Sequence, residues 1–376
     1  MSHIAIASGG TGGHFYPTLA IAEAALESGH GITLFVAGHH ADDQLAIARE
    51  RGFTAVKLPA VRLPRSATAA AAFPFRFTWS LLRAGRALGR IRPDVVLGMG
   101  SFASIPLGLS AVLRRVPLVL HEGNSLMGRA NRILSRWARV AATSLPLAEN
   151  HRPRCPTVRT GMPLRKALLR AAETKEPPAP ELYAAFGLAP GTPTVLVFGG
   201  SQGARVLNRV VPPAFLELAE KHPGLRIVHQ SGVAEYAAVR AAYEAAGDRA
   251  EVVDFINDIG ARYAAADLVI ARAGALTLAE LTALGKPAIL VPFPHAAHDH
   301  QSFNARALVR AGAAEMIPED GLDSGKLADK LEKLIVDGDR RRQMAAAARS
   351  LARLGAREKI VDHCLKLLAE KGSKNG

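Results

Sequence analysis

The stretch "IAIASGGTGGHFYP", residues 4–17, joins a short apolar run to a cluster of glycines and then to a predicted helix. A buried strand that ends in glycines and leads into a helix is suited to anions, because backbone N–H groups and the positive end of the helix dipole point at the loop. A second stretch of this form, "VLVFGGSQGAR", begins at residue 195. The repeat lies about one domain length later and predicts two domains of the same kind.

Short apolar strands alternate with helix-length segments through both halves of the chain. Continuous apolar strands of this kind predict an α/β fold with two doubly wound parallel sheets, each covered on both faces. We expect a first domain over 1–162, a second over 163–354, and a proline-rich interdomain connection or surface loop over 173–193. The helix expected over 355–376 either completes the second domain or packs back on the first. The predicted strands are "HIAIA", "GITLFVAG", "DVVLGMG" and "PLVLHE", then "TVLVFGG", "RIVHQSG", "ADLVIARAG" and "PAILVPF".

The composition limits the class of protein. The chain has 376 residues, of which 49% are hydrophobic, and its two cysteines, Cys155 and Cys364, form no disulfide or zinc pattern. No signal peptide and no apolar run of roughly 18 residues is apparent, so we expect a cytoplasmic protein that does not span a membrane. The net charge of +14 is uneven, with 19 Lys and Arg against 8 Asp and Glu in residues 1–160 and 28 against 25 afterwards. The first half should therefore seek an anionic partner.

The first glycine loop does not fit two common nucleotide motifs. A dinucleotide fingerprint needs a third glycine where Phe15 stands, and an acidic residue where the second strand ends in Ala37 and Gly38. Neither glycine loop is followed by Lys and then Ser or Thr, so a loop for nucleoside triphosphate hydrolysis is absent as well.

Seven longer motifs together resemble the bacterial MurG family in order and spacing, over nearly the whole chain. They are "SGGTGGHFYP", "PDVVLGMGSFASIP", "LHEGNSLMGRANR", "GGSQGARVLN", "HQSG", "RAGALTLAEL" and "HDHQSFNA". The resemblance implies the GT-B architecture, with two Rossmann-like domains facing across a cleft. It also implies an inverting transferase of peptidoglycan synthesis that moves N-acetylglucosamine from UDP-N-acetylglucosamine to undecaprenyl-linked lipid I, making lipid II.

The same resemblance assigns the UDP-sugar to the second domain. Ser201, Gln202 and Gly203 would approach the diphosphate, and Ile256 would meet the uracil through its backbone. Glu280 would take the ribose hydroxyls, since a carboxylate accepts two hydrogen bonds. A competing interpretation makes Glu280 part of a capping box with Thr277. The other expected donor-binding residues are Arg165, Arg272, Gly274, Ala275, Leu276, Thr277, Gln301 and Asn304.

Transfer needs a base for the attacking hydroxyl and stabilisation of the leaving diphosphate. His14 is the candidate base, in competition with Glu122 and His121. The family pattern implies no cofactor and no metal. A metal-dependent alternative rests on "HAAHDH" (295–300) and "DGD" (337–339), in which Asp339 is more typical of a helix N-cap.

Acceptor contacts are expected in the first domain. Three motifs there depart from the usual family pattern: Ser101 and Phe102 replace the end of G-M-G-G-Y, Gly123 changes H-E-Q-N, and Met162 changes G-N-P. The expected acceptor-binding residues are Thr11, Gly12, Gly13, His14, Ser101, Phe102 and Asn124.

Residues 73–91, read as a helix that Pro74 begins, carry two different faces. Phe73, Phe77, Leu81, Leu88 and Ile91 share one face that suits a core. The other face suits the surface of an anionic membrane, and its alternative is an ordinary solvated basic face. The second face holds Phe75, Arg76, Trp79, Leu82, Arg83, Arg86 and Arg90.

Two other functions remain open: a GT-B enzyme that glycosylates diacylglycerol from a UDP-sugar, and a non-catalytic scaffold of cell-wall assembly. The expected partners are the UDP-sugar, lipid I, an anionic membrane surface at the cytoplasmic face of the inner membrane and other cell-wall synthesis proteins. Nucleic acid is not expected, because no recognised nucleic-acid-binding module accompanies the basic charge.

Overall fold

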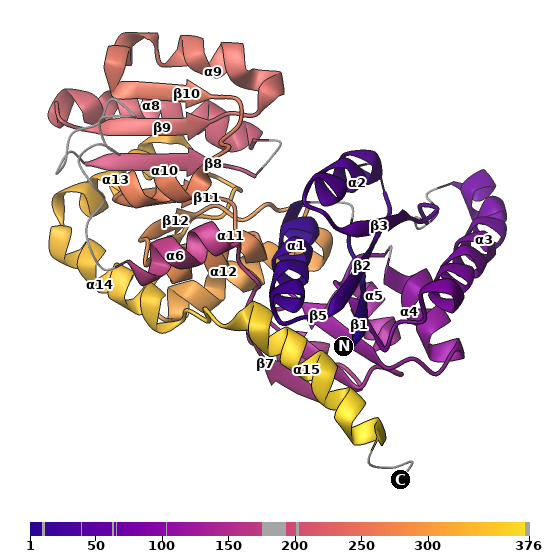
Figure 1. Cartoon of the computed structure of the whole chain (residues 1–376). Coiled ribbons are helices and arrows are strands. Elements are labelled where there is room, and N and C mark those ends of the chain that lie inside the picture. The colour runs from indigo at the N-terminus through magenta and orange to yellow at the C-terminus, as the bar shows by residue number, and fades with distance from the viewer. Residues whose placement is uncertain are drawn as a thin grey trace. The chain divides into compact units, whose positions relative to one another are not determined.

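The structure is a computed structural model that describes residues 1–9, 12–38, 40–61, 64, 66–102, 104–174, 193–200 and 203–372. It divides into two compact units, one of Met1–Arg165 with Arg353–Gly376 and one of Lys166–Ala352 (Figure 1). The domain boundary expected from the sequence lies between residues 162 and 163. Arg165 was therefore expected in the second domain, whereas the structure has it in the first unit.

The first unit is built on a parallel sheet whose strand order in the described residues is β3-β2-β1-β4-β5-β6-β7. The order reverses between β1 and β4, and in such sheets the loops that leave these two strands diverge and open a crevice at their carboxyl ends. The first glycine loop follows β1 and therefore lies at this reversal. The strands are β1 (His3–Ala7), β2 (Gly31–Val36), β3 (Thr54–Lys57), β4 (Val95–Gly98), β5 (Leu118–Glu122), β6 (Val140–Thr143) and β7 (Thr157–Arg159).

Helices cover both faces of this sheet. Alternate residues of each strand point to opposite sides, and the apolar residues on both sides need a covering layer. Ile4 and Ile6 of β1 lie in one core, with residues of α1, α2 and α15, and Ala5 and Ala7 lie in the other, with residues of α3, α4 and α5. Helix α15 also contacts α1, which places the last helix on the first unit. The helices are α1 (Gly12–Glu27), α2 (Ala41–Glu50), α3 (Ala67–Ile91), α4 (Ser104–Leu113), α5 (Arg129–Leu134) and α15 (Ala356–Gly372).

The second unit repeats the plan, with strand order β10-β9-β8-β11-β12-β13 and a reversal between β8 and β11. Its second glycine loop follows β8, so it occupies the position that the first loop has in the other sheet. The strands are β8 (Thr194–Phe198), β9 (Arg226–Gln230), β10 (Ala250–Val253), β11 (Leu268–Ala271), β12 (Ala288–Leu290) and β13 (Ala314–Met316). The helices are α6 (Lys166–Glu173), α8 (Arg205–Lys221), α9 (Tyr236–Ala242), α10 (Ile259–Ala265), α11 (Ala275–Leu284), α12 (His300–Arg310), α13 (Ser324–Val336) and α14 (Gly338–Ser350).

The predicted α/β class with two doubly wound parallel sheets is confirmed, and all eight predicted strands are present. The strands that the sequence did not indicate are mostly edge strands. Strands β3, β7, β10 and β13 close the two sheets, and their residues are largely half-buried or exposed. An edge strand needs no continuous apolar run, and this is why the pattern did not reveal them.

Helix α3 begins at Ala67, earlier than expected, and Pro74 lies inside it. The residues before Pro74 are mostly alanine, the strongest helix former. They continue the helix toward the N-terminus even though Pro74 has no N–H to donate to it. No helix among the described residues combines the length and apolar character needed to cross a membrane.

Candidate functional site

The second glycine loop lies between β8 and α8, and the structure describes its residues up to Gly200 and again from Gly203. Gly200 and Gly203 have positive φ angles of 97° and 71°, and the N–H of Gly203 donates to the carbonyl of Gly200 at 2.9 Å. A side chain at 203 is excluded, since its Cβ would lie 2.0 Å from the carbonyl oxygen of Ser231. Ser201 and Gln202, both expected at the donor diphosphate, lie outside the described residues.

Helix α11 starts at the end of the neighbouring strand β11. Gly274 is its N-cap, and Ala275, Leu276 and Thr277 form its first turn. The capping-box interpretation of Thr277 and Glu280 is therefore wrong, because a capping box needs Thr277 at the N-cap. Glu280 is 6% exposed and accepts a hydrogen bond from the Tyr263 hydroxyl at 3.2 Å, so its carboxylate is fixed in position.

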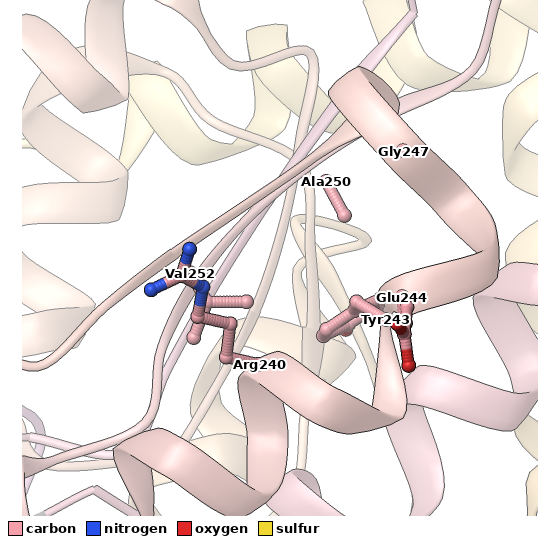
Figure 2. A pocket seen from close by; sticks show the side chains of 6 residues that line it. All are labelled: Arg240, Tyr243, Glu244, Gly247, Ala250 and Val252. Carbon is pink, nitrogen blue, oxygen red and sulfur yellow. The ribbon is translucent and has the colours of Figure 1, made fainter.

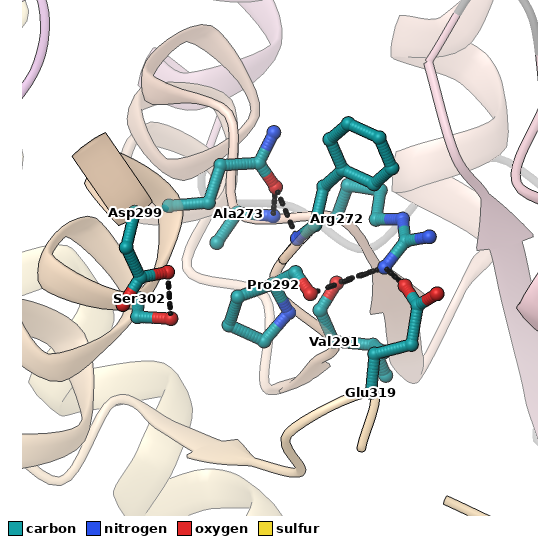
Figure 3. A network of polar contacts seen from close by, with 9 residues as sticks. Arg272, Ala273, Val291, Pro292, Asp299, Ser302 and Glu319 are labelled. Atoms are coloured by element: carbon teal, nitrogen blue, oxygen red, sulfur yellow. Dashed lines mark hydrogen bonds and ion pairs between the residues drawn. The ribbon is translucent and has the colours of Figure 1, made fainter. Parts of the chain in front are cut away.

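Arg272 lies at the end of β11 within a network that Figure 3 shows. Its Nη1 donates to the carbonyls of Val291 and Pro292, both at 3.1 Å, and forms an ion pair with Glu319 at 2.5 Å. The guanidinium also lies over the ring of Phe293, 5.2 Å from the ring centroid. Within the described part of the chain, Arg272 forms its hydrogen bonds and its ion pair through Nη1. A guanidinium has five N–H donors, so others remain available for an anion.

Gln301 and Asn304 of α12 hold the same region together. Gln301 Oε1 accepts from the backbone N–H groups of Ala273, at 3.1 Å, and Phe293, at 3.0 Å. Both partners are donors, so the assignment of the amide oxygen is forced, and the Nε2 group is the part of Gln301 that can donate to a sugar oxygen. Asn304 is fully buried and donates to the carbonyl of Ala273 at 3.1 Å, as a supporting residue would.

The remaining expected donor residues lie elsewhere. Ile256 is half-buried in the loop after β10, at the carboxyl edge of the second sheet. Arg165 is the last residue of the first unit before α6, and its guanidinium lies over the ring of Tyr16 at 5.0 Å from the centroid. Tyr16 belongs to α1, so an aromatic ring close to the first glycine loop orients this arginine.

The first glycine loop leads into α1, whose first turn contains Gly12, Gly13 and His14. Gly9 is packed so tightly that a Cβ there would lie 2.7 Å from Ser101 Cβ and 2.8 Å from His14 Cγ. The Gln44 side chain donates to the carbonyl of Gly9 at 3.1 Å. Ser101, Phe102 and His14 are half-buried and lie in the segments that leave β1 and β4, while Thr11 is outside the described residues.

His121 and Glu122, the other candidate bases, are buried at the end of β5. His121 Nε2 lies 3.0 Å from Ser144 Oγ and 3.3 Å from the carbonyl of Gly161, and burial lowers the pKa of His121 to about 4. The hydrogen bond to Gly161 raises this pKa in part, and the charge of His14 lowers it.

Glu122 is 3% exposed, and its carboxylate organises the loop that follows β5. Its Oε1 accepts from Asn124 N at 3.1 Å and Asn124 Nδ2 at 3.3 Å. Its Oε2 accepts from Gly128 N at 2.9 Å and Asn131 Nδ2 at 3.0 Å. Burial raises the pKa of Glu122, and these four hydrogen bonds oppose the rise. The carboxylate therefore already accepts four hydrogen bonds from the residues that follow β5.

The two faces of α3 differ in exposure. On the expected core face Leu88 is buried and Phe73, Phe77, Leu81 and Ile91 are half-buried. The other face is exposed, with Phe75 at 77%, Trp79 at 49% and Leu82 at 47%, and the Arg83 guanidinium lies over the Trp79 ring. Arg76, Arg86 and Arg90 are also exposed. Apolar and basic side chains thus share one solvent-facing surface.

The segments behind the metal-dependent alternative have other roles. Asp337 is the N-cap of α14 and accepts from Arg340 N at 2.8 Å, so the expectation that Asp339 caps this helix is wrong. In the "HAAHDH" segment the Asp299 carboxylate accepts from the Ser302 hydroxyl at 2.6 Å. Among the described residues no group of three or more His, Cys, Asp or Glu side chains is arranged to hold a metal ion.

A cavity of about 240 Å³ lies apart from these segments, in the second unit (Figure 2). None of the expected site residues lines it. The residues around it are Arg240, Tyr243, Glu244, Gly247, Ala250 and Val252.

Three residues that contact the expected site were not indicated by the sequence. Tyr263 holds Glu280, Glu319 holds Arg272, and Gln44 holds the first glycine loop. Each comes from a separate element, and no local motif contains both partners. Only the packing of the folded unit brings them together.

Comparison with known proteins identifies the family. Residues 4–143 match the glycosyltransferase family 28 N-terminal domain, and residues 194–363 match its C-terminal domain. A protein from Halorhodospira halophila is 42% identical over 366 residues, covering 96% of this chain and 97% of the relative. A protein from Anaeromyxobacter sp. is 39% identical over 383 residues, covering 99% and 95%. Both are named UDP-N-acetylglucosamine–N-acetylmuramyl-(pentapeptide) pyrophosphoryl-undecaprenol N-acetylglucosamine transferase.

The crystal structure of Acinetobacter baumannii MurG is similar in fold, with a TM-score of 0.77 and 29% identity. The match covers 97% of this chain and all of that one, which confirms the expected GT-B class with two Rossmann-like domains. The chain therefore belongs to glycosyltransferase family 28 and, within it, to the MurG family.

Proposed function

We propose that this protein transfers N-acetylglucosamine from UDP-N-acetylglucosamine to the 4-hydroxyl of the muramyl sugar of lipid I, with inversion, to make lipid II for peptidoglycan. The observation that carries the proposal is the match, over nearly the full length of both chains, to relatives whose name states this reaction. Cell-wall growth, and with it cell shape and division, would depend on the product.

The donor is proposed to bind at the carboxyl edge of the second sheet. The glycine loop after β8, the start of α11 and the network around Arg272 and Gln301 all follow strands that end at this edge. Backbone amides, a helix N-terminus and an arginine are the groups that can stabilise a leaving diphosphate without a metal. Glu280 would accept hydrogen bonds from the ribose, with Tyr263 fixing its carboxylate.

His14 is the proposed general base. Of the three candidates it is the one that is half-buried, while His121 and Glu122 are nearly inaccessible and hydrogen-bonded within the first unit. A base must reach the proton it removes, and a half-exposed imidazole meets that requirement better than a carboxylate that already accepts four hydrogen bonds. Glu122 would instead hold Asn124 in place on the acceptor side.

The first glycine loop is proposed to hold the diphosphate of the acceptor. It begins a helix, and its Gly12 and Gly13 are exposed, so their backbone is open to a ligand. Ser101 and Phe102 follow the neighbouring strand β4 and would line the same side. Thr11 belongs to this proposal by sequence alone.

We propose that α3 binds the protein to the cytoplasmic face of the inner membrane. Arg76, Arg83, Arg86 and Arg90 surround the exposed apolar residues of this helix. At about 1 kcal/mol for each basic residue near an anionic surface, four arginines give weak and reversible binding. Binding of that strength suits an enzyme that takes a lipid-linked acceptor from the membrane and then releases a lipid-linked product.

The reaction is tested with radiolabelled UDP-N-acetylglucosamine and two acceptors, lipid I and diacylglycerol. We expect label to appear in lipid II and none in a glycolipid. Transfer to diacylglycerol would identify the alternative lipid glycosyltransferase, and transfer to neither acceptor would favour a scaffold of cell-wall assembly.

Membrane attachment is tested by flotation with anionic liposomes at low and high salt. We expect binding that decreases with salt and that is lost in the double variant Trp79→Ala, Arg83→Glu. A matched double variant on an exposed part of the second unit, Val336→Ala with Arg340→Glu, should bind like the wild type. Binding that ignores salt, or that survives the α3 double variant, contradicts this part of the proposal.

A further inference from the structure

The "HQSG" segment, residues 229–232, has no role in the function described so far, although it belongs to the motifs that mark the family. It ends β9, the strand next to β8, and His229 and Gln230 lie opposite Val197 and Phe198. These are the residues that lead into the second glycine loop. The segment therefore lies directly beside the point where that loop leaves the sheet.

Two contacts join the loop to this segment. The Gln230 side chain donates through Nε2 to the carbonyl of Gly200 at 2.9 Å. Gly203 lies against the Ser231 carbonyl so closely that any Cβ would overlap it. The described residues on both sides of the loop tip are thus placed by Gln230 and by the backbone of Ser231.

Asn208, on the first turn of α8, fixes the Ser231 carbonyl in turn. Its Nδ2 donates to this carbonyl at 2.9 Å and to the Glu235 carboxylate at 2.5 Å. Since both of these partners accept, the other side of the amide must be the oxygen, and Asn208 Oδ1 lies 3.1 Å from His229 Nε2.

This arrangement settles the proton positions along a buried chain. Asn208 Oδ1 can only accept, so His229 carries its proton on Nε2, and its Nδ1 accepts from the Tyr243 hydroxyl at 2.9 Å. His229 is fully buried and Tyr243 is 3% exposed, and burial lowers the pKa of His229 to about 3. The histidine is neutral at ordinary pH, and each polar group named here has a partner, which makes the chain rigid.

We infer that Asn208 and Gln230 are positioning residues for the second glycine loop, and that they set its grip on the diphosphate of the UDP-sugar. The inference rests on the proposed function, because it takes that loop as the diphosphate site. Neither side chain needs to touch the nucleotide. Asn208 acts through the Ser231 carbonyl beneath Gly203, and Gln230 acts through the carbonyl of Gly200.

The test compares the binding of UDP with that of uridine, which lacks the phosphates, by titration calorimetry. The variants are Gln230→Met and Asn208→Leu, which keep the approximate size of each side chain and remove its hydrogen bonds. Asn208→Asp keeps the acceptor for His229 and turns the donor that faces Ser231 into an acceptor. The control is Thr282→Val, which removes another side-chain hydrogen bond of the same unit, from Thr282 Oγ1 to the carbonyl of Ala279, and involves no residue of the loop.

We expect the wild type to bind UDP more tightly than uridine. Each of the three variants should bind UDP about tenfold more weakly, as expected when one positioning hydrogen bond is lost, with uridine affinity within about twofold. Thr282→Val should change neither. The KM for the UDP-sugar should rise in the same three variants while the KM for lipid I stays constant.

The outcomes separate the two claims. If the wild type prefers UDP and Gln230→Met and Asn208→Leu keep that preference, the positioning role is overturned and the proposed function stands. Equal loss of UDP and uridine binding in the variants would also overturn it, because it would show a general loss of structure. If the wild type binds UDP no better than uridine, the donor site is wrong and both claims fall.

Discussion

The two glycine loops have the same place in their sheets but different surroundings. Each follows the strand at which the order reverses, and in each a glutamine amide donates to a glycine carbonyl, Gln44 to Gly9 and Gln230 to Gly200. The second loop lies on backbone, with the Ser231 carbonyl beneath Gly203. The first lies on side chains, with Ser101 and His14 beside Gly9.

The surroundings also differ in how completely their polar atoms are paired. Behind the second loop, Asn208, His229 and Tyr243 form a closed chain of hydrogen bonds. Near the first loop, Gln44 Oε1 and Ser101 Oγ are buried and have no hydrogen-bond partner within the described part of the chain. Unpaired buried polar atoms are costly and mark places where a ligand can supply the partner. The described polar groups behind the second loop are thus fixed by hydrogen bonds, whereas two buried polar atoms near the first loop are left for a ligand to pair.

The largest effect is expected from Gly203→Ala. The new Cβ would overlap the Ser231 carbonyl, and the φ of 71° disfavours any side chain, so the loop must move. We expect UDP affinity to fall by about a hundredfold, or ~3 kcal/mol, by calorimetry. Gly224→Ala, whose Cβ would meet nothing within 4 Å, is the control. An unchanged affinity in Gly203→Ala would contradict the assignment of the donor diphosphate to this loop.

Acid stability distinguishes the units by their buried histidines. The folded pKa of His229, about 3, is below the unfolded value of 6.5. Its contribution to stability is therefore complete above pH 6.5 and is lost progressively as the pH falls toward 3. The reason is that His229 takes up a proton in the unfolded state but stays neutral in the folded state over this range. At pH 5 the loss is about 2 kcal/mol.

Urea unfolding at pH 5 and pH 7.5 measures this loss. The variant His229→Gln should lose less stability than the wild type between the two pH values, by about the same ~2 kcal/mol. The His121 contribution in the first unit, where the pKa is about 4, should persist in this variant. An identical pH dependence in wild type and variant would mean that His229 is not buried in its neutral form.

Gly9→Ala should have a smaller and different effect. Its Cβ would lie 2.7 Å from Ser101 Cβ and 2.8 Å from His14 Cγ, so both residues must shift. Gly9 has no positive φ angle, however, so the substitution avoids the backbone strain of Gly203→Ala. We expect turnover to fall by about tenfold, or ~1.4 kcal/mol in activation free energy, with UDP affinity unchanged. Steady-state kinetics and calorimetry on the same preparation separate these quantities. A loss of UDP affinity would remove the distinction between an acceptor loop and a donor loop.

Ser101→Gly is expected to have the smallest effect. It removes a buried hydroxyl that lacks a partner among the described residues. The KM for lipid I should change by no more than about fivefold, since a single uncharged hydrogen bond contributes about 1 kcal/mol or less. A change in the KM for the UDP-sugar would contradict the assignment of Ser101 to the acceptor side.

The sequence predicted the sheets well and the details of the site less well. Internal strands such as "TVLVF" were evident because both faces are buried, whereas the half-exposed edge strands carry no such pattern. The expected donor residues of the second half lie in loops that follow strands of one sheet or in the helices α11 and α12. They come together because the strands of a parallel sheet end at the same edge. The contacts of Glu319 with Arg272 and of Tyr263 with Glu280 could not be predicted. Only tertiary packing brings these residues together.

The central claim is that the first loop serves the acceptor, with His14 as its base, and the second serves the donor. His14→Ala tests it most directly, by following transfer from radiolabelled UDP-N-acetylglucosamine to lipid I alongside UDP affinity. A general base contributes about a hundredfold or more, so turnover should fall at least that far while UDP affinity stays within about twofold. Unchanged turnover, or a loss of UDP binding equal to the loss of turnover, would contradict the account.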